Sequence, residues 1–302
     1  MTVDLTYFLC IFVASIAFLV VGALIGGLLA GLDRVISAKL QGRVGPPVLQ
    51  PFYDVAKLIN KENASINTSE RVYMMLALIF VALAGGVFFS GNSLIFCIFI
   101  VTLSSLMIIV AAYSSASPFA ETGGAREILQ VLSYEPMVIM FAVLIFMASG
   151  KAGIEQFSLM NVMDLFKLEN PSIMYCIPAF IGLVYVLTIK LRKSPFDISS
   201  AAHAHQEIVS GITTEMSGRT LAIFEVIHWL ETVLFLGWVA TFFICSNPIF
   251  IPNTIIAVVV IWFFEILIDN NFARMKWQFM LKSAWAVTFI CCFINIVLIN
   301  FI

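Results

Sequence analysis

Three titratable side chains recur at a regular spacing inside one hydrophobic stretch, residues 221–246. Glu225, His228 and Glu231 stand at positions i, i+3 and i+6, and on an α-helix this spacing places them on one side, within about 120°. A charge at bilayer depth costs at least about 2.5–3.5 kcal/mol, so such groups usually face a bundle interior or a wet cavity. The pattern predicts a proton relay. The alternative is that the acids only pair with bases or lie at the membrane surface.

Further acids extend this group toward one end. Glu215 stands just before the same stretch, Glu207 lies earlier in its entry loop, and Glu135 opens another hydrophobic stretch, 135–150. Buried acids that neighbour one another can take up and release protons near neutral pH. We therefore expect Glu207 and Glu215 to pass protons from a cytoplasmic loop to the group on residues 221–246.

Two other sets of polar residues have less specific spacing. Glu265 and Asp269, at i and i+4, end the stretch 249–269 and form a candidate second acidic site, although pairing with bases explains them equally well. His203 and His205 precede Glu207, but two histidines at i and i+2 without a well-spaced third ligand do not predict a metal site. No metal or cofactor site is expected in this chain.

The composition decides which elements must hold these residues. The chain has 302 residues, of which 61% are hydrophobic and 11% charged, whereas soluble domains carry roughly 25% charged residues. Its net charge of −2 gives no basic surplus for nucleic acid. The six cysteines all fall in apolar stretches without a C-x-x-C pair, so iron–sulfur ligation is not expected here.

Eight stretches approach the roughly 20 apolar residues that a membrane span requires. They are residues 8–31, 72–90, 93–113, 135–150, 172–191, 221–246, 249–269 and 284–302. Together they predict an all-α polytopic bundle of about eight transmembrane helices, with residues 1–302 forming a single integral membrane domain.

Basic residues are concentrated on one side of this bundle. All 16 Lys and Arg residues except Lys151 and Lys167 lie in or beside four loops that eight spans place on the same side. These loops are residues 32–71, 114–134, 192–220 and 270–283. The positive-inside rule assigns them to the cytoplasm. We therefore expect a multi-pass protein of the cell membrane with both termini outside.

One segment of the first loop is amphipathic. Residues 46–62 are too short to span a bilayer, yet they alternate apolar and charged positions at helical spacing. The apolar positions are Phe52, Val55, Leu58 and Ile59, and the charged ones are Asp54, Lys57 and Lys61. This pattern predicts an interfacial helix at the cytoplasmic surface.

The four basic loops also carry recognisable motifs. Their residues, in chain order, are 32–46 (LDRVISAKLQGRVGP) with Leu49-Gln50-Pro51, Arg126 with Ser133-Tyr134-Glu135, Ser194-Pro195-Phe196-Asp197 with Glu207-x-Val209-x-Gly211, and Ala273-Arg274-x-Lys276-Trp277-Gln278 with Trp285. Over the whole chain, this series resembles the subunit 1 family of respiratory NADH dehydrogenase. The resemblance implies that Glu135, Glu207 and Glu215 match acids of that family's water-filled channel.

Within that family, some positions depart from the quinone-reducing type. The segment between Gly45-Pro46 and Leu49-Gln50-Pro51 is shorter, and His228 stands where that type usually has Glu. Residues 218–222 (GRTLA) and 269–274 (DNNFAR) instead look like the membrane-bound, energy-converting [NiFe] hydrogenases, with the Ech type nearest in appearance.

The hydrogenase resemblance implies a membrane anchor and ion-coupling subunit. Such a subunit holds the hydrogenase large and small subunits and an iron–sulfur subunit at the membrane, beside an antiporter-like subunit. In such a complex, electrons from reduced ferredoxin reduce protons to hydrogen, and this reaction is coupled to pumping of H⁺ or Na⁺. Ferredoxin is therefore only an indirect partner of the membrane subunit. The [NiFe] centre and [4Fe–4S] clusters are then in the partner subunits.

The basic loops are expected to dock these partners. The candidate docking residues are Arg34, Gln41, Arg43, Gly45, Pro46, Arg126, Asp197, Arg219 and Arg274. Three alternatives remain: a quinone-site subunit of an NADH dehydrogenase-like complex, the matching subunit of formate hydrogenlyase or a sulfur-reducing relative, and a stand-alone carrier. A quinone tunnel would line the first loop and the first helix, and a carrier would purify without iron.

Overall fold

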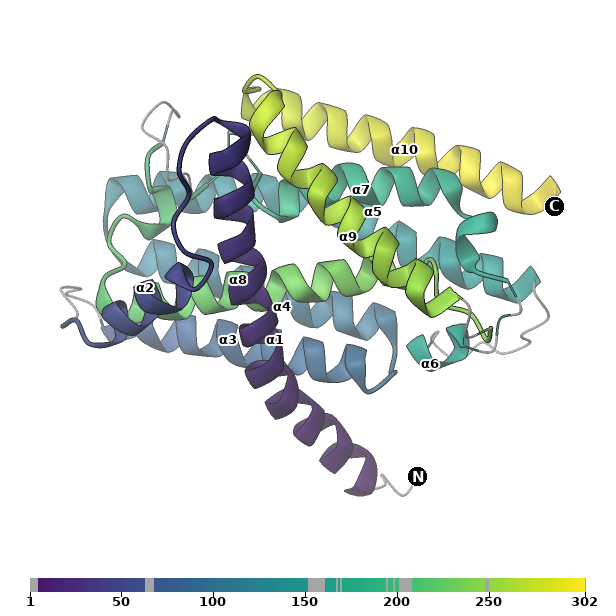
Figure 1. The fold of residues 1–302 in the computed structure, drawn as a ribbon, viewed down its shortest axis with the longest axis horizontal. Helices are drawn as coiled ribbons and strands as arrows, with labels where there is room; N and C mark the ends of the chain where they lie inside the picture. The colour runs from purple at the N-terminus through teal and green to yellow at the C-terminus, as the bar shows by residue number, and fades with distance from the viewer. Residues whose placement is uncertain are drawn as a thin grey trace.

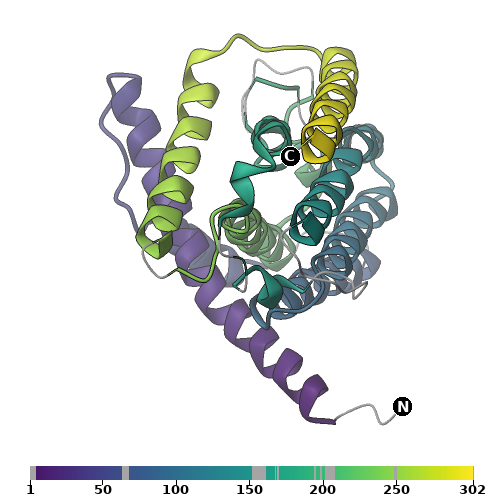
Figure 2. The same cartoon turned by 90° about the vertical axis from the view of Figure 1, so that its right-hand side faces the viewer.

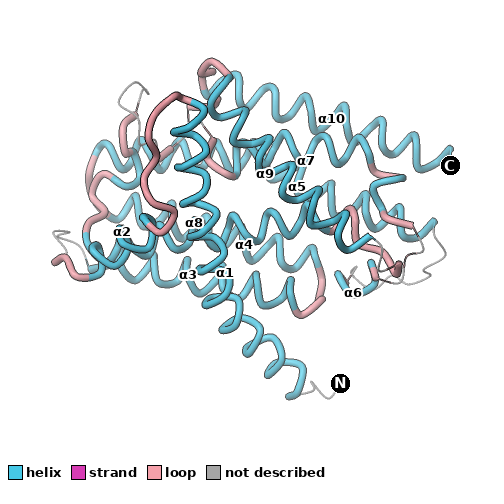
Figure 3. Tube along the Cα trace, viewed as in Figure 1, coloured by secondary structure: helices cyan, strands magenta, loops and turns pink. Residues whose placement is uncertain are grey.

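The computed structural model is a bundle of helices joined by loops (Figure 3). It describes residues 5–62, 68–151, 161–166, 168, 170–193, 195–197, 199–200, 208–247 and 250–301. Among these residues there is no β-strand. The predicted all-α class is therefore confirmed.

Seven of the described helices are long and apolar enough to cross a membrane. They are α1 (Leu5–Leu40), α3 (Thr68–Phe89), α4 (Leu94–Ser114), α5 (Pro118–Lys151), α8 (Gly218–Ala240), α9 (Phe250–Asn271) and α10 (Trp277–Phe301). The shorter α7 (Ile177–Lys190) is also apolar and lies inside the bundle. With α7, the described part of the chain agrees with the predicted bundle of about eight spans.

The helices form an inner group and a peripheral group. Helices α3, α4, α5, α7 and α8 run roughly alongside one another, whereas α1 and α9 cross them obliquely on one side (Figures 1 and 2). Half or more of the most apolar part of α3, α4, α5 and α8 is buried, against 17% for α1 and 22% for α9. The inner helices therefore supply the core, and α1 and α9 present apolar side chains outward.

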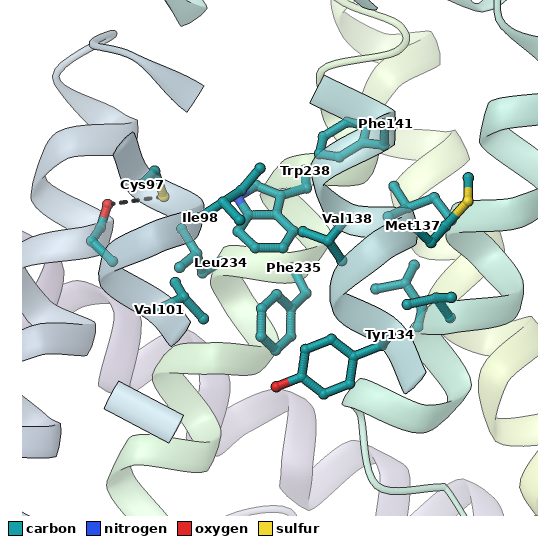
Figure 4. Packing of buried hydrophobic residues seen from close by; sticks show 14 of the residues in the cluster. Cys97, Ile98, Val101, Tyr134, Met137, Val138, Phe141, Leu234, Phe235 and Trp238 are labelled. Carbon is teal, nitrogen blue, oxygen red and sulfur yellow. Dashed lines mark hydrogen bonds between the residues drawn. The ribbon is translucent and has the colours of Figure 1, made fainter. Parts of the chain in front are cut away.

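Aromatic packing fixes α8 against α5. Trp238 on α8 is almost fully buried and lies with its ring centroid 5.0 Å from Phe235 and 6.1 Å from Phe141 of α5. Figure 4 shows these rings between α5, α8 and the side chains of α4 around Ile98 and Val101. Aromatic pairs add about 0.5–1.5 kcal/mol each beyond their buried area. This cluster holds together the two helices that carry the buried acids Glu127 and Glu231.

Two small helices complete the described part. Helix α2 (Gln50–Ile59) contains the predicted amphipathic segment and packs on α1 and α8. Its Phe52 ring lies 5.3 Å from that of Trp229, and Gly27 on α1 makes room because a Cβ there would lie 2.5 Å from the Phe52 ring. Helix α6 (Val162–Leu165) lies in the connection between α5 and α7.

The predicted boundaries were wrong for several helices. Most of the expected loop 114–134 is the first half of α5, which begins at Pro118, so Glu135 lies in mid-helix rather than at its start. Helix α1 continues to Leu40 and α10 begins at Trp277, earlier than predicted. The polar residues in these segments made them resemble loops. In the structure these residues have partners on other helices, so they lie within helices of the bundle.

Pro136 lies inside α5 without ending it. A proline lacks the N–H that would bond the carbonyl four residues earlier, which is that of Leu132. The indole Nε1 of Trp285 on α10 donates to the Leu132 carbonyl instead, at 3.1 Å. This hydrogen bond allows α5 to pass Pro136 and ties α10 to its polar half.

Candidate ion-relay site

Three bases at the end of α7 each face an acid from another part of the bundle. Lys190, Arg192 and Lys193 are buried, with side chains exposed by only 7%, 10% and 9%. The sequence presented them only as markers of the cytoplasmic side. In the structure they are the counter-ions of Glu231, Glu127 and Asp33.

A turn in the backbone spreads these bases apart. Helix α7 ends at Lys190, the amide of Lys193 bonds the Thr188 carbonyl, and the amide of Arg192 bonds the Ile189 carbonyl. This pairing is a Schellman motif, in which glycine usually takes the left-handed position. Here Arg192 takes it, with φ of 55°. The turn lets neighbouring side chains point to different helices, at a backbone cost of roughly 1–2 kcal/mol.

Lys190 points into the centre of the bundle. Its Nζ lies 3.8 Å from Oε1 of Glu231 and donates to Ser105 Oγ at 3.2 Å. The same ammonium lies 4.4 Å from the ring centroid of Tyr134 and 4.8 Å from that of Phe235. Cation–π contacts in a desolvated site contribute about 2 kcal/mol. Lys190 and Glu231 thus form a buried ion pair enclosed by aromatic rings.

Arg192 pairs with an acid that sequence reasoning missed. Its guanidinium donates to Glu127 of α5 at 3.0 Å and lies over the ring of Phe224. Glu127 is 4% exposed and also accepts a hydrogen bond from Ser199. Glu127 was placed in a polar loop by its neighbours in the sequence. Only the i, i+3 spacing of Glu127 and Gln130 could have indicated a buried helical face.

Lys193 joins a second acidic group between α1 and α9. Its Nζ bonds Asp33 of α1 and lies 3.8 Å from Asp269 of α9. One turn before Asp269, Glu265 is completely buried, and neither of its carboxylate oxygens has a hydrogen-bond partner among the described residues. The Glu265–Asp269 pair, predicted as a possible second acidic site, therefore lies near Lys193 at the end of α7.

His228 lies on the α1 and α9 side of α8. It lines a cavity of about 50 Å³ together with Asp33, Lys193 and Trp262. Its Nδ1 is buried and has no hydrogen-bond partner among the described residues. A cavity of this size with polar walls can hold a few water molecules. His228 therefore connects more directly to the Lys193 group than to Glu231, although both belong to α8.

The other predicted relay residues are distributed around these groups. Glu225 is half-buried and feels the charges of Arg34 and Arg192, and Glu135 accepts a hydrogen bond from Thr102 at 3.0 Å. Glu215 is exposed. Glu207, like His203 and His205, lies outside the described residues. The structure thus brings the α8 acids near the α7 bases, with Glu215 at the surface.

Glu70 is a further buried acid that the sequence did not single out. It is 1% exposed in the first turn of α3 and interacts electrostatically with Glu215. Its position directly before an apolar stretch made it look like a loop residue. Among the described residues, no cluster of three His, Cys, Asp or Glu side chains could hold a metal ion.

The predicted docking residues divide into exposed and internal sets. The exposed ones are Arg34, Gln41, Arg43, Pro46 and Arg219, and the half-buried ones are Gly45, Arg126 and Arg274. Asp197 is buried and bonds Arg126 at 3.0 Å, and Arg126 also lies over the ring of Trp277.

Two of the exposed residues hold the first loop in place. Gln41 donates to Asn270 at the end of α9 and accepts from Arg43. Arg34 bonds Asp54 of α2 at 2.8 Å. Partial burial acts to raise the pKa of the Asp54 carboxyl, but hydrogen bonds from Arg34 and Gln50 hold it below its ordinary value.

Comparisons with known proteins agree with this architecture. Residues 13–300 match the family described as NADH dehydrogenase. The chain belongs to the NADH dehydrogenase subunit 1 family. It is 25% identical to NADH-ubiquinone oxidoreductase chain 1 of Cyanidium caldarium, over 92% of this chain and 87% of that one.

Relatives in this family serve different complexes. The chain is also 25% identical to formate hydrogenlyase subunit 4 of Escherichia coli (strain K12), over 86% of this chain and 89% of that protein. In fold it matches a chain of the archaeal membrane-bound sulfane sulfur reductase, with a TM-score of 0.82 over 96% of this chain and 99% of that one, at 20% identity.

The family membership confirms the predicted resemblance. This multi-pass membrane protein is a membrane subunit of a complex I-like respiratory or hydrogenase complex. Relatives of this kind belong to multisubunit assemblies, so partner subunits are expected here as well.

Proposed function

We propose that this chain is the membrane anchor and ion-coupling subunit of an Ech-type [NiFe] hydrogenase complex. In this proposal the complex oxidises ferredoxin, evolves hydrogen and translocates H⁺ or Na⁺. The motifs at residues 218–222 and 269–274 support the hydrogenase type, as does the similarity to formate hydrogenlyase subunit 4. The large, small and iron–sulfur subunits dock on the basic loops in the cytoplasm, and an antiporter-like subunit lies alongside.

The observation that carries the coupling role is the set of buried ion pairs on α7. Three cations on four consecutive positions share acids from α1, α5, α8 and α9. In the low dielectric of a bundle, each charge strongly affects its neighbours. A change of charge at the docked arm, or a shift of residues 190–193, therefore changes which acids hold protons.

Purification of the intact complex tests the class of this protein. The proposal expects nickel, iron and a hydrophilic hydrogenase arm to co-purify with this chain. Inverted vesicles supplied with reduced ferredoxin should evolve hydrogen and acidify or take up sodium. Co-purification with an NADH-oxidising arm, without nickel, would refute the hydrogenase assignment and leave the family intact.

The coupling role has its own test. Glu135→Gln should abolish ion uptake by the vesicles, because the amide cannot carry a proton, while hydrogen evolution with a soluble dye continues. The matched control is Glu121→Gln, at an exposed position in the first turn of the same helix. Normal uptake in Glu135→Gln would remove this residue from the relay.

One cavity favours the alternative of a quinone-site subunit. It has a volume of about 290 Å³ and lies between α1, α8 and α9, lined by apolar residues that include Ile25, Leu29, Leu236 and Trp262. Of these helices, α1 is the one expected to line a quinone tunnel. A photoreactive quinone that labels α1 or α9, with competition by unlabelled quinone and quinone-dependent turnover, would favour this alternative over the hydrogenase.

A further inference from the structure

A second cavity opens between α2, α3 and α8, away from the ion pairs. It has a volume of about 280 Å³ and is lined mainly by apolar side chains. These are Val55 and Ile59 of α2, Met75 and Leu78 of α3, and Ala222, Ile223 and Val226 of α8. Arg71 and Arg219 complete its wall. The cavity is therefore apolar inside, with two guanidinium groups as its polar part.

The same two arginines line a neighbouring polar cavity. It also measures about 280 Å³, and its other walls are Asn60, Lys61 and Glu62. Three cations face one carboxylate there, so the polar cavity attracts anions. Because Arg71 and Arg219 belong to both cavities, the apolar cleft and the basic cavity lie next to each other.

The position of these arginines at the ends of two spans matches the depth of a lipid headgroup in the bilayer. Arg71 lies in the first turn of α3 and Arg219 in the first turn of α8, and both helices are long enough to span a membrane. The amphipathic α2 lies beside them, at one end of the bundle (Figure 1). Interfacial helices and the basic ends of spans lie at the depth of lipid phosphates.

Of the two arginines, Arg71 is incompletely satisfied by the described residues. The Nε of Arg71 is buried and has no hydrogen-bond partner among the described residues. Arg219 donates from Nε to the carbonyl of Ile59, at 3.3 Å, which fixes its side chain at the end of α2. A buried guanidinium N–H without a partner is costly. A phosphate oxygen would satisfy it, since phosphate accepts strong, often paired, hydrogen bonds from guanidinium groups.

The apolar surface continues beyond the cleft along α3. Val72, Met75 and Ile79 are each about half exposed on this helix, and they follow helical spacing from the level of Arg71 into the span. This is the path of an acyl chain whose headgroup is held at the start of α3. A free inorganic anion would use only the basic cavity and would leave the apolar cleft unexplained.

We propose that the cleft between α2, α3 and α8 binds one anionic phospholipid. Its phosphate lies between Arg71 and Arg219, near Lys61, and an acyl chain enters the apolar cleft along Met75 and Val226. The lipid fills the space below α2 and fastens this helix to the bundle. This site is independent of the hydrogenase assignment, since it depends only on this chain and the bilayer.

Native mass spectrometry of the purified complex tests the proposal. The delipidated complex is titrated with phosphatidylglycerol and with phosphatidylcholine of the same chains. The wild-type complex should retain one phosphatidylglycerol in preference to phosphatidylcholine. Two surface charges at about 1 kcal/mol each make Arg71→Gln/Arg219→Gln bind phosphatidylglycerol about thirtyfold more weakly. The control Lys57→Gln removes an exposed base of α2 that lines neither cavity, and should bind normally.

A second variant separates the acyl chain from the phosphate. Val226→Trp fills the apolar cleft without changing a charge, so phosphatidylglycerol retention should fall while inorganic phosphate still competes at the basic cavity. Equal retention of the two lipids by wild type would refute the site. So would an equal loss in the Lys57→Gln control, unchanged retention in Val226→Trp, or cross-linking of the Ile223→Cys variant to another subunit with no lipid bound.

Discussion

Removing the Lys190 charge is the sharpest test of the buried ion pairs. In Lys190→Met the Glu231 carboxylate remains among apolar and aromatic side chains, 4% exposed, without its cation. At the 3.8 Å between Nζ and Oε1, Coulomb's law with an effective dielectric constant of 20 gives an attraction of about 4 kcal/mol. Breaking one side of a buried pair typically costs 3–5 kcal/mol, which agrees. We therefore expect Lys190→Met to lower the stability of the complex by about 4 kcal/mol.

The same substitution should abolish ion movement. Without the Lys190 charge, the Glu231 carboxylate loses the partner that connects it to the bases at the end of α7, so vesicles containing Lys190→Met should evolve hydrogen with a soluble dye but fail to move ions. The double variant Lys190→Met/Glu231→Gln removes the uncompensated charge. It should recover most of the lost thermal stability without recovering ion movement.

The assays are thermal unfolding of the detergent-solubilised complex, followed by size-exclusion chromatography, and ion uptake by inverted vesicles. Lys282→Met is the matched control, because it removes an exposed lysine from α10. Normal ion uptake and unchanged unfolding in Lys190→Met would refute the reasoning. A double variant as unstable as the single one would show that packing, and not the unpaired charge, causes the loss.

Other parts of the structure give further expectations. Arg192→Ala and Arg192→Gly both lose the ion pair with Glu127, but glycine adopts the left-handed backbone conformation without strain. In chemical denaturation, the free energy of unfolding of Arg192→Gly should therefore exceed that of Arg192→Ala by about 1 kcal/mol. Trp285→Phe should cost about 1 kcal/mol by removing the bond to Leu132, and adding Pro136→Ala should restore part of it, since the new amide can reach that carbonyl; equal effects in both backgrounds would contradict this. Charge reversal in Arg43→Glu should weaken retention of the peripheral subunits on affinity purification while the membrane chain stays folded, and an intact assembly would count against this loop as their seat.

Several features of the fold could be predicted because they are local in the sequence. Long apolar stretches predict spans, and helical periodicity in residues 46–62 predicted α2, which the structure places at Gln50–Ile59. The motifs of the basic loops were sufficient to predict the family, because they recur in order along the whole chain. Neither inference requires a contact between distant residues.

The beginning of α5 could not be predicted in the same way. Residues such as Arg126 and Glu127 led to the prediction of a polar loop, because a hydropathy scale assigns every charged residue a preference for water. Whether a charge can lie inside a bundle depends on whether another helix supplies its partner, here Asp197 for Arg126 and Arg192 for Glu127. That pairing is a property of the tertiary structure. The predicted start of this helix, residue 135, is therefore later than its actual start at Pro118.

The same reason divides the candidate site. The sequence by itself determined that the acids on residues 221–246 lie within a membrane helix and that the bases gather toward one side. Only the tertiary structure decided that Lys190 and Lys193 turn inward, that Glu231 and Asp33 are their partners, and that His228 belongs with the second of these. A side chain's type and spacing fix its position on its own helix. Its charge state and chemistry depend on the groups that other helices place within a few ångströms of it.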